Sequence, residues 1–80
     1  MHGHRCIQSL LGDLTDRAHR EKTTRITVVS LRLGPSEELT EQAVRDLFEI
    51  HAKGTVAEGA ELAFSPGGPG ELALLSFDCE

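Results

Sequence analysis

The sequence predicts an α+β fold in which two helices pack on one face of a three-stranded sheet. Two segments space their apolar residues at helical intervals, and one segment between them is rich in β-branched residues. Two short apolar runs follow, separated by a stretch of proline and glycine. In chain order these segments predict helix, strand, helix, strand, strand. We therefore expect one compact domain over residues 1–80, since a chain of this length buries about 60% of the surface that its unfolded form exposes.

The first predicted helix spans His4 to Lys22. Polar residues fill one face, and the apolar face consists of Ile7, Leu10, Leu11, Leu14 and Ala18. Gly12 interrupts the pattern, and a glycine inside a helix costs up to about 1 kcal/mol relative to alanine. Cys6 lies near the apolar face, so we interpret it as a small core residue.

The segment from Arg25 to Leu33 predicts a strand, because it is rich in Val, Ile and Thr. Its alternation of polar and apolar residues is imperfect, which predicts a bulge or a partly covered second face. Ile26 and Val28 are expected on the outer face. The inward face is expected to consist of Val29, Leu31 and Leu33.

The second predicted helix begins after Thr40 and ends at Gly54. Thr40 is a suitable N-cap, and Glu41 places a negative charge in the first turn, where it suits the helix dipole. A glycine just after the helical pattern is a common helix end. The predicted buried stripe consists of Ala43, Val44, Leu47, Phe48 and Ile50.

The last two apolar runs, Ala60 to Ser65 and Glu71 to Glu80, predict a β-hairpin. The stretch Pro66–Gly70, with the sequence PGGPG, is the expected loop. The side chains expected to face the core are Leu62, Phe64, Leu75 and Phe77. Cys79 is expected on the same face of the strand as Leu75 and Phe77, so we interpret it as a core residue as well.

Composition excludes several classes of function. Eight Lys and Arg residues against thirteen Asp and Glu residues give a net charge of −5, which is the wrong sign for binding nucleic acid or an anionic membrane. Trp and Tyr are absent and Phe occurs three times, which leaves no stacking platform for single-stranded nucleic acid. The start of the sequence lacks the apolar segment of a signal peptide, and no stretch resembles a membrane span, so we expect a cytoplasmic location.

The cysteines and histidines predict neither a zinc site nor a catalytic centre. Cys6 and Cys79 lie near opposite ends of the chain, and no CxxC pair occurs, so we expect no structural zinc. His19 is expected to be solvated, and His51 is expected at the end of a helix or half-buried. No Ser-His-Asp or Cys-His order indicates a nucleophile, so we expect a protein that is not an enzyme.

The N-terminus offers a set of nitrogen donors for a metal. The Met1 amine, the deprotonated amide of His2 and the His2 Nδ1 form adjacent five- and six-membered chelate rings. The Gly3 amide can add a fourth in-plane donor, and His4 an axial or substitute donor. Tetragonal sets of nitrogen ligands suit Ni(II) and Cu(II). The alternative is a frayed terminus that binds no metal.

The sequence resembles the nickel-binding domain of the HypA/HybF family. The resemblance rests on the opening Met1-His2, the helix after it, the strand RITVVSLRLG and above all FEIHAKGTVAEGAEL from Phe48 to Leu62. It implies a metallochaperone-like accessory protein for [NiFe]-hydrogenase maturation that binds nickel through Met1 and His2 and the backbone of Gly3. The partners that it implies are the [NiFe]-hydrogenase large subunit or a nickel-loading GTPase.

Two departures from the family pattern are visible. Between its last two strands the family carries a zinc-binding insertion with two CxxC-type pairs, and here the loop 66–70 takes its place. The family's Met-His-Glu start is Met-His-Gly in this chain, so the nickel-associated glutamate is missing at Gly3. These departures leave an alternative function: a non-metal interaction module or subunit that docks on a hydrogenase component and has lost nickel delivery.

Overall fold

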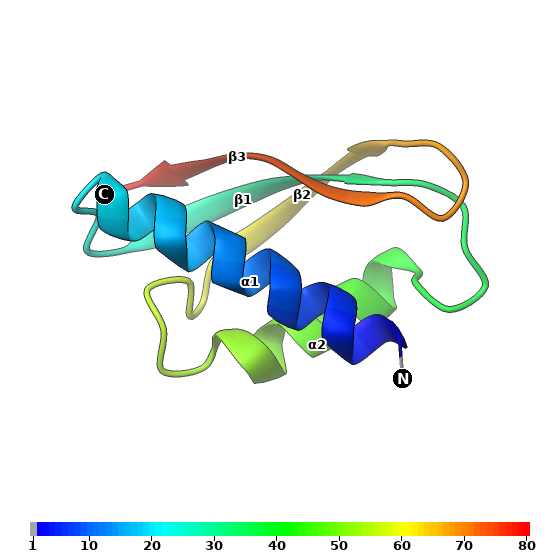
Figure 1. The fold of residues 1–80 in the computed structure, drawn as a ribbon, viewed down its shortest axis with the longest axis horizontal. Coiled ribbons are helices and arrows are strands. Elements are labelled where there is room, and N and C mark those ends of the chain that lie inside the picture. The colour runs from blue at the N-terminus through cyan, green and yellow to red at the C-terminus, as the bar shows by residue number, and fades with distance from the viewer. Residues whose placement is uncertain (1) are drawn as a thin grey trace.

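The computed structural model describes residues 2–80, and of His2 it describes the backbone alone. The elements are α1 (His2–Arg20), β1 (Ile26–Leu33), α2 (Glu41–Ala52), β2 (Glu61–Pro66) and β3 (Leu72–Cys79). Both helices cover the same face of the three-stranded sheet (Figure 1). This arrangement confirms the predicted α+β class and the order of its elements. No helix within residues 2–80 is both long and apolar enough to cross a membrane.

The sheet has the order β2-β1-β3, so the predicted hairpin between the last two strands is wrong. β1 lies in the centre and pairs with β2 in parallel and with β3 in antiparallel orientation. The loop after β2 therefore passes over the end of β1, across about twice the usual spacing between neighbouring strands. The backbone N–H of Gly67 donates to the carbonyl of Leu33 at 3.1 Å, and that of Gly70 to the carbonyl of Pro35 at 2.8 Å.

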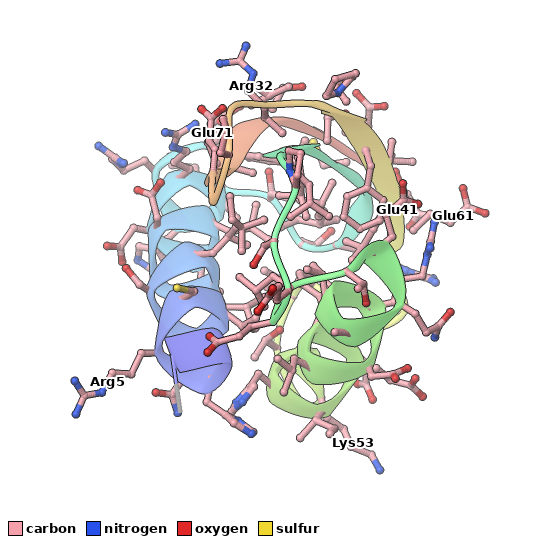
Figure 2. The ribbon with its side chains drawn as sticks, turned by 90° about the vertical axis from the view of Figure 1, so that its right-hand side faces the viewer. Arg5, Arg32, Glu41, Lys53, Glu61 and Glu71 are labelled. Carbon is pink, nitrogen blue, oxygen red and sulfur yellow. The ribbon has the colours of Figure 1, made fainter. Side chains whose placement is uncertain are left out.

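Gly34 is the residue that this crossing requires. A Cβ at position 34 would overlap the carbonyl oxygen of Gly68 in the loop. The Gly34 N–H donates to the carbonyl of Glu71 at 2.9 Å, and this hydrogen bond joins the end of β1 to the residue that follows the loop. Glu71 also lies 3.7 Å from the guanidinium of Arg32, and Figure 2 shows both side chains at the same end of the sheet.

Two irregularities in the pairing of β1 with β3 confirm the predicted bulge and change which side chains face the core. The shift between Ile26 and Val28 turns Ile26 inward, where it is fully buried, so its expected outward position is wrong. The second shift, between Ser30 and Leu31, changes the parity of β3. As a result Leu74 takes the core-facing place expected of Leu75, which is 39% exposed, so the predicted burial of Leu75 is wrong, whereas Phe77 packs against the core as predicted.

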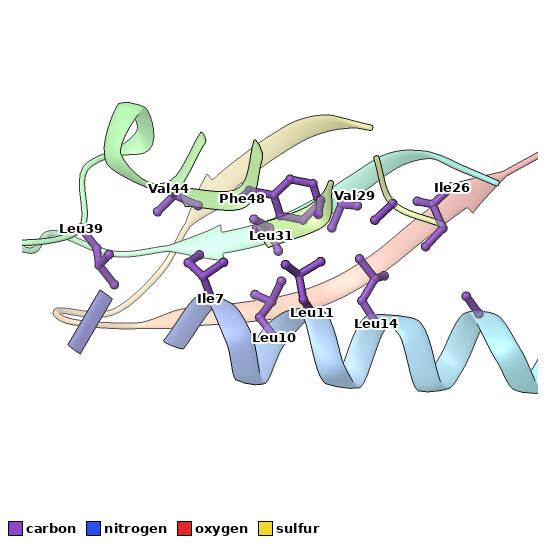
Figure 3. Packing of buried hydrophobic residues seen from close by; sticks show 13 residues of the cluster. Ile7, Leu10, Leu11, Leu14, Ile26, Val29, Leu31, Leu39, Val44 and Phe48 are labelled. Atoms are coloured by element: carbon purple, nitrogen blue, oxygen red, sulfur yellow. The ribbon is translucent and has the colours of Figure 1, made fainter. Parts of the chain in front are cut away.

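The core lies between the helices and the sheet (Figure 3). All five apolar residues of the predicted α1 face are buried, which confirms that face. Val44, Phe48 and Ala52 form the buried stripe of α2, with Leu47 partly buried beside it. Ile50 is 64% exposed, so its predicted burial is wrong; it lies about 200° around the helix from Phe48.

The ends of α2 are as predicted. The Thr40 hydroxyl accepts a hydrogen bond from the Ala43 N–H at 3.1 Å, and Gly54 adopts a positive φ of 81° two residues after the helix. Cys6 and Cys79 are free and exposed, so their interpretation as core residues is wrong. Cys6 precedes the buried Ile7 and points about 100° away from it, and Cys79 ends an edge strand whose parity has changed.

Candidate metal centre

The predicted nitrogen donors lie at the start of α1. Met1 lies outside the described residues, as does the side chain of His2, whereas the backbone of His2 and Gly3 forms the first turn of the helix. Backbone N–H groups in the first turn of a helix have no acceptor within the helix. The amide nitrogens of His2 and Gly3 can therefore bind a group outside the helix without breaking a hydrogen bond within α1.

Gly3 lies against the second helix. It is buried, and a Cβ at this position would lie 3.1 Å from Leu47 Cδ1 and 3.5 Å from Leu39 Cδ2. A larger residue at position 3 would require the end of the Leu47 side chain to move. Gly3 thus allows α1 to approach α2 closely at the site of the predicted nitrogen donors.

His4 and His51 form a polar contact between the two helices. The distance from His4 Nδ1 to His51 Nε2 is 2.9 Å, and the rings meet edge to face with centroids 5.1 Å apart. In Figure 2 Arg5, in the first turn of α1, and Lys53, just after α2, both lie on the lower side of the molecule, away from the sheet. The structure therefore brings a second imidazole to the predicted site.

His51 is half-buried near the end of α2, as predicted, but its contact with His4 was not predicted. Helical spacing was the available signal. His4 precedes the buried Ile7 by three residues, and His51 follows the buried Phe48 by three, so each histidine extends an apolar stripe. His19 is exposed, as predicted.

Among the side chains that the structure describes, no group of three or more His, Cys, Asp or Glu residues could hold a metal ion. His4 and His51 supply two imidazoles at most. A site with four nitrogen donors at this position therefore needs donors in addition to these two imidazoles.

The structure is that of a small α+β protein with imidazole and backbone nitrogen atoms at the junction of its two helices. The family described as "Hydrogenase/urease nickel incorporation, metallochaperone, hypA" matches residues 1–68. The chain belongs to this HypA family, which is a family of metallochaperones and not of enzymes. The resemblance and the expectation of a non-enzymatic protein are thereby confirmed.

Curated relatives support the assignment. The chain is 43% identical over 63 residues to the hydrogenase maturation factor HypA of Thermomicrobium roseum, a match that covers 79% of this chain and 48% of the relative. It is 34% identical over 64 residues to HypA of Caldanaerobacter subterraneus subsp. tengcongensis, covering 80% of this chain and 56% of the relative. The chain thus spans about half the length of the curated relatives that it matches.

A solved structure shares the fold. The solution structure of the Ni metallochaperone HypA from Helicobacter pylori superposes with a TM-score of 0.77 and covers 95% of both chains, at 14% sequence identity. This likeness confirms the fold.

Proposed function

We propose that the protein is a nickel-binding, metallochaperone-like accessory protein of [NiFe]-hydrogenase maturation. The proposal rests chiefly on the family match over residues 1–68, which includes the N-terminal donors. Its ligands for Ni(II) are the Met1 amine, the amide and Nδ1 of His2 and the Gly3 amide, with His4 nearby. Nickel is the cargo of such a protein.

The position of the backbone donors suits this chemistry. Amides in the first turn of α1 have no intrahelical partner, so their deprotonation breaks no helix hydrogen bond. Two deprotonated amides, a neutral amine and a neutral imidazole balance the charge of Ni(II). The neutral complex therefore avoids the repulsion that a helix N-terminus exerts on a free cation.

The site is expected to depend strongly on pH and to select poorly between metals. Each amide ligand releases a proton when the metal enters, so affinity rises with pH and binding fails below neutrality. Cu(II) binds nitrogen ligands more tightly than Ni(II) does, so it should compete successfully in vitro. The absence of a carboxylate at Gly3 removes one group that could otherwise hold the ion.

Nickel titration of protein with a native, untagged start tests the proposal. We expect one Ni(II) per chain bound at the N-terminus, with nickel-dependent d–d absorption at mildly alkaline pH, and a loss of this absorption in His2→Ala. His19→Ala is the matched control, since His19 is an exposed histidine of the same helix. Absence of the absorption band in untagged protein, or wild-type nickel affinity in His2→Ala, would contradict the proposal.

We propose that the surface formed by α1 and the N-terminus binds the [NiFe]-hydrogenase large subunit or the nickel-loading GTPase. Pull-down from the native host, with untagged-start protein carrying its affinity tag at the C-terminus, should recover one of these two components. Recovery that is independent of His2 and of nickel would favour the metal-free interaction module over nickel delivery. Recovery of neither component would contradict the partner assignment.

A further inference from the structure

We propose that His4 and His51 form a two-imidazole site for a late first-row divalent ion, Ni(II) or Cu(II), which bridges α1 and α2. This site does not require the Met1 amine or the backbone amides. It is therefore distinct from the N-terminal chelate, although the two sites lie on neighbouring residues of α1.

The distance between the two ring nitrogens supports this assignment. Imidazole nitrogens bind such metals at about 2.0–2.1 Å. Two nitrogens at right angles around a metal at this bond length lie about 2.9 Å apart, which is the distance from His4 Nδ1 to His51 Nε2. Tetrahedral coordination would instead require about 3.4 Å between them. This spacing is also that of the hydrogen bond between the rings, and turning both rings so that their lone pairs meet at one point would place the nitrogens at adjacent positions of tetragonal or octahedral coordination, which suits Ni(II) and Cu(II).

A change of tautomer in one ring would make both facing nitrogens available to a metal, with no proton released. In the present contact one facing nitrogen donates a proton to the lone pair of the other. If both rings carry their proton on the far nitrogen, His4 Nε2 and His51 Nδ1, two lone pairs face the space between the rings. This change moves a proton between the nitrogens of one ring and leaves both imidazoles neutral, which is the form that binds metals.

The two helices that carry the pair pack against each other beside it. Ile7 and Phe48, each three residues from one of the histidines, are buried at 0% and 3% exposure. The close approach of Gly3 to Leu47 holds the first turn of α1 against α2. Since the helices are already packed, binding orders little additional chain, which favours affinity.

The test uses protein in which the N-terminal chelate has been removed. A Gly-Ser-Gly-Ser extension converts the Met1 amine into an amide, and His2→Ala removes the neighbouring imidazole. In this background we expect one Ni(II) or Cu(II) per chain and a melting temperature that rises with metal. Adding His51→Gln should lower the affinity at least about tenfold and abolish the thermal shift, whereas adding His19→Gln should change neither.

Glutamine can still hydrogen-bond to His4, so circular dichroism of the metal-free His51→Gln variant should match that of the background. Cu(II) should broaden the NMR signals of the His4 and His51 rings before those of His19. Equal binding by the His51→Gln variant, or equal broadening at His19, would overturn the proposal. Absence of metal binding by the extended His2→Ala protein would also overturn the proposal. If the untagged protein still bound nickel in that case, the N-terminal chelate would remain supported.

Discussion

Phe48→Ala is expected to destabilise the protein more than any other truncation in α2. Phe48 is 3% exposed and lies between the helices and the sheet, where its ring reaches the side chains that line the core (Figure 3). Truncation of a buried phenylalanine to alanine costs about 3–5 kcal/mol, because transfer energy is lost and a cavity remains. A domain of this size has about 5–15 kcal/mol of stability at most, so the loss is a large share of the total.

Thermal denaturation followed by circular dichroism measures the effect. For a domain of 60–100 residues, each kcal/mol shifts the melting temperature by about 4–8 °C, so Phe48→Ala should lower it by at least about 12 °C. Ile50→Ala is the matched control on the same helix, since Ile50 is 64% exposed and should change stability by less than about 0.5 kcal/mol. Equal effects of the two variants would show that α2 presents a different face to the core.

Four further predictions concern two glycines, the N-cap of α2 and the metal-free fold. Gly12→Ala should raise stability by about 0.5–1 kcal/mol in thermal melts, because a Cβ at Gly12 would contact nothing within 4 Å. Gly34→Ala should abolish cooperative unfolding, since its Cβ would overlap the carbonyl oxygen of Gly68. Thr40→Ala should cost about 1 kcal/mol in urea denaturation through loss of the N-cap, and Thr40→Ser, which keeps the hydroxyl, should cost much less. Because the core is apolar and the described side chains include no metal cluster, the melting temperature should be the same with and without a strong chelator, and a drop of several degrees would refute this.

Features determined by neighbours along the chain could be predicted from the sequence. The apolar face of α1 follows from helical spacing, and Thr40 and Gly54 mark the limits of α2 through their own backbone chemistry. The N-terminal chelate was likewise derived from adjacent donors. Because Met1 and the side chain of His2 lie outside the described residues, that donor set stays a prediction.

Features that depend on distant pairing could not be predicted in the same way. The loop 66–70 has a length and composition that suit a hairpin, and nothing local indicates that it crosses over β1 instead. The bulges opposite β3 reversed the expected positions of Ile26 and Leu75, since a single shift changes the parity of a strand. His4 and His51 are 47 positions apart, so their contact follows from the packing of α1 on α2.

Proton release on nickel binding tests the central claim most directly. Chelation by backbone amides must liberate amide protons, whereas binding to neutral imidazoles liberates none. In a pH-stat titration of untagged protein above the pKa of the amine, we expect about one to two protons per Ni(II), and none from the His2→Ala protein with the Gly-Ser-Gly-Ser extension. Stoichiometric nickel binding by untagged protein without proton release would contradict the N-terminal chelate.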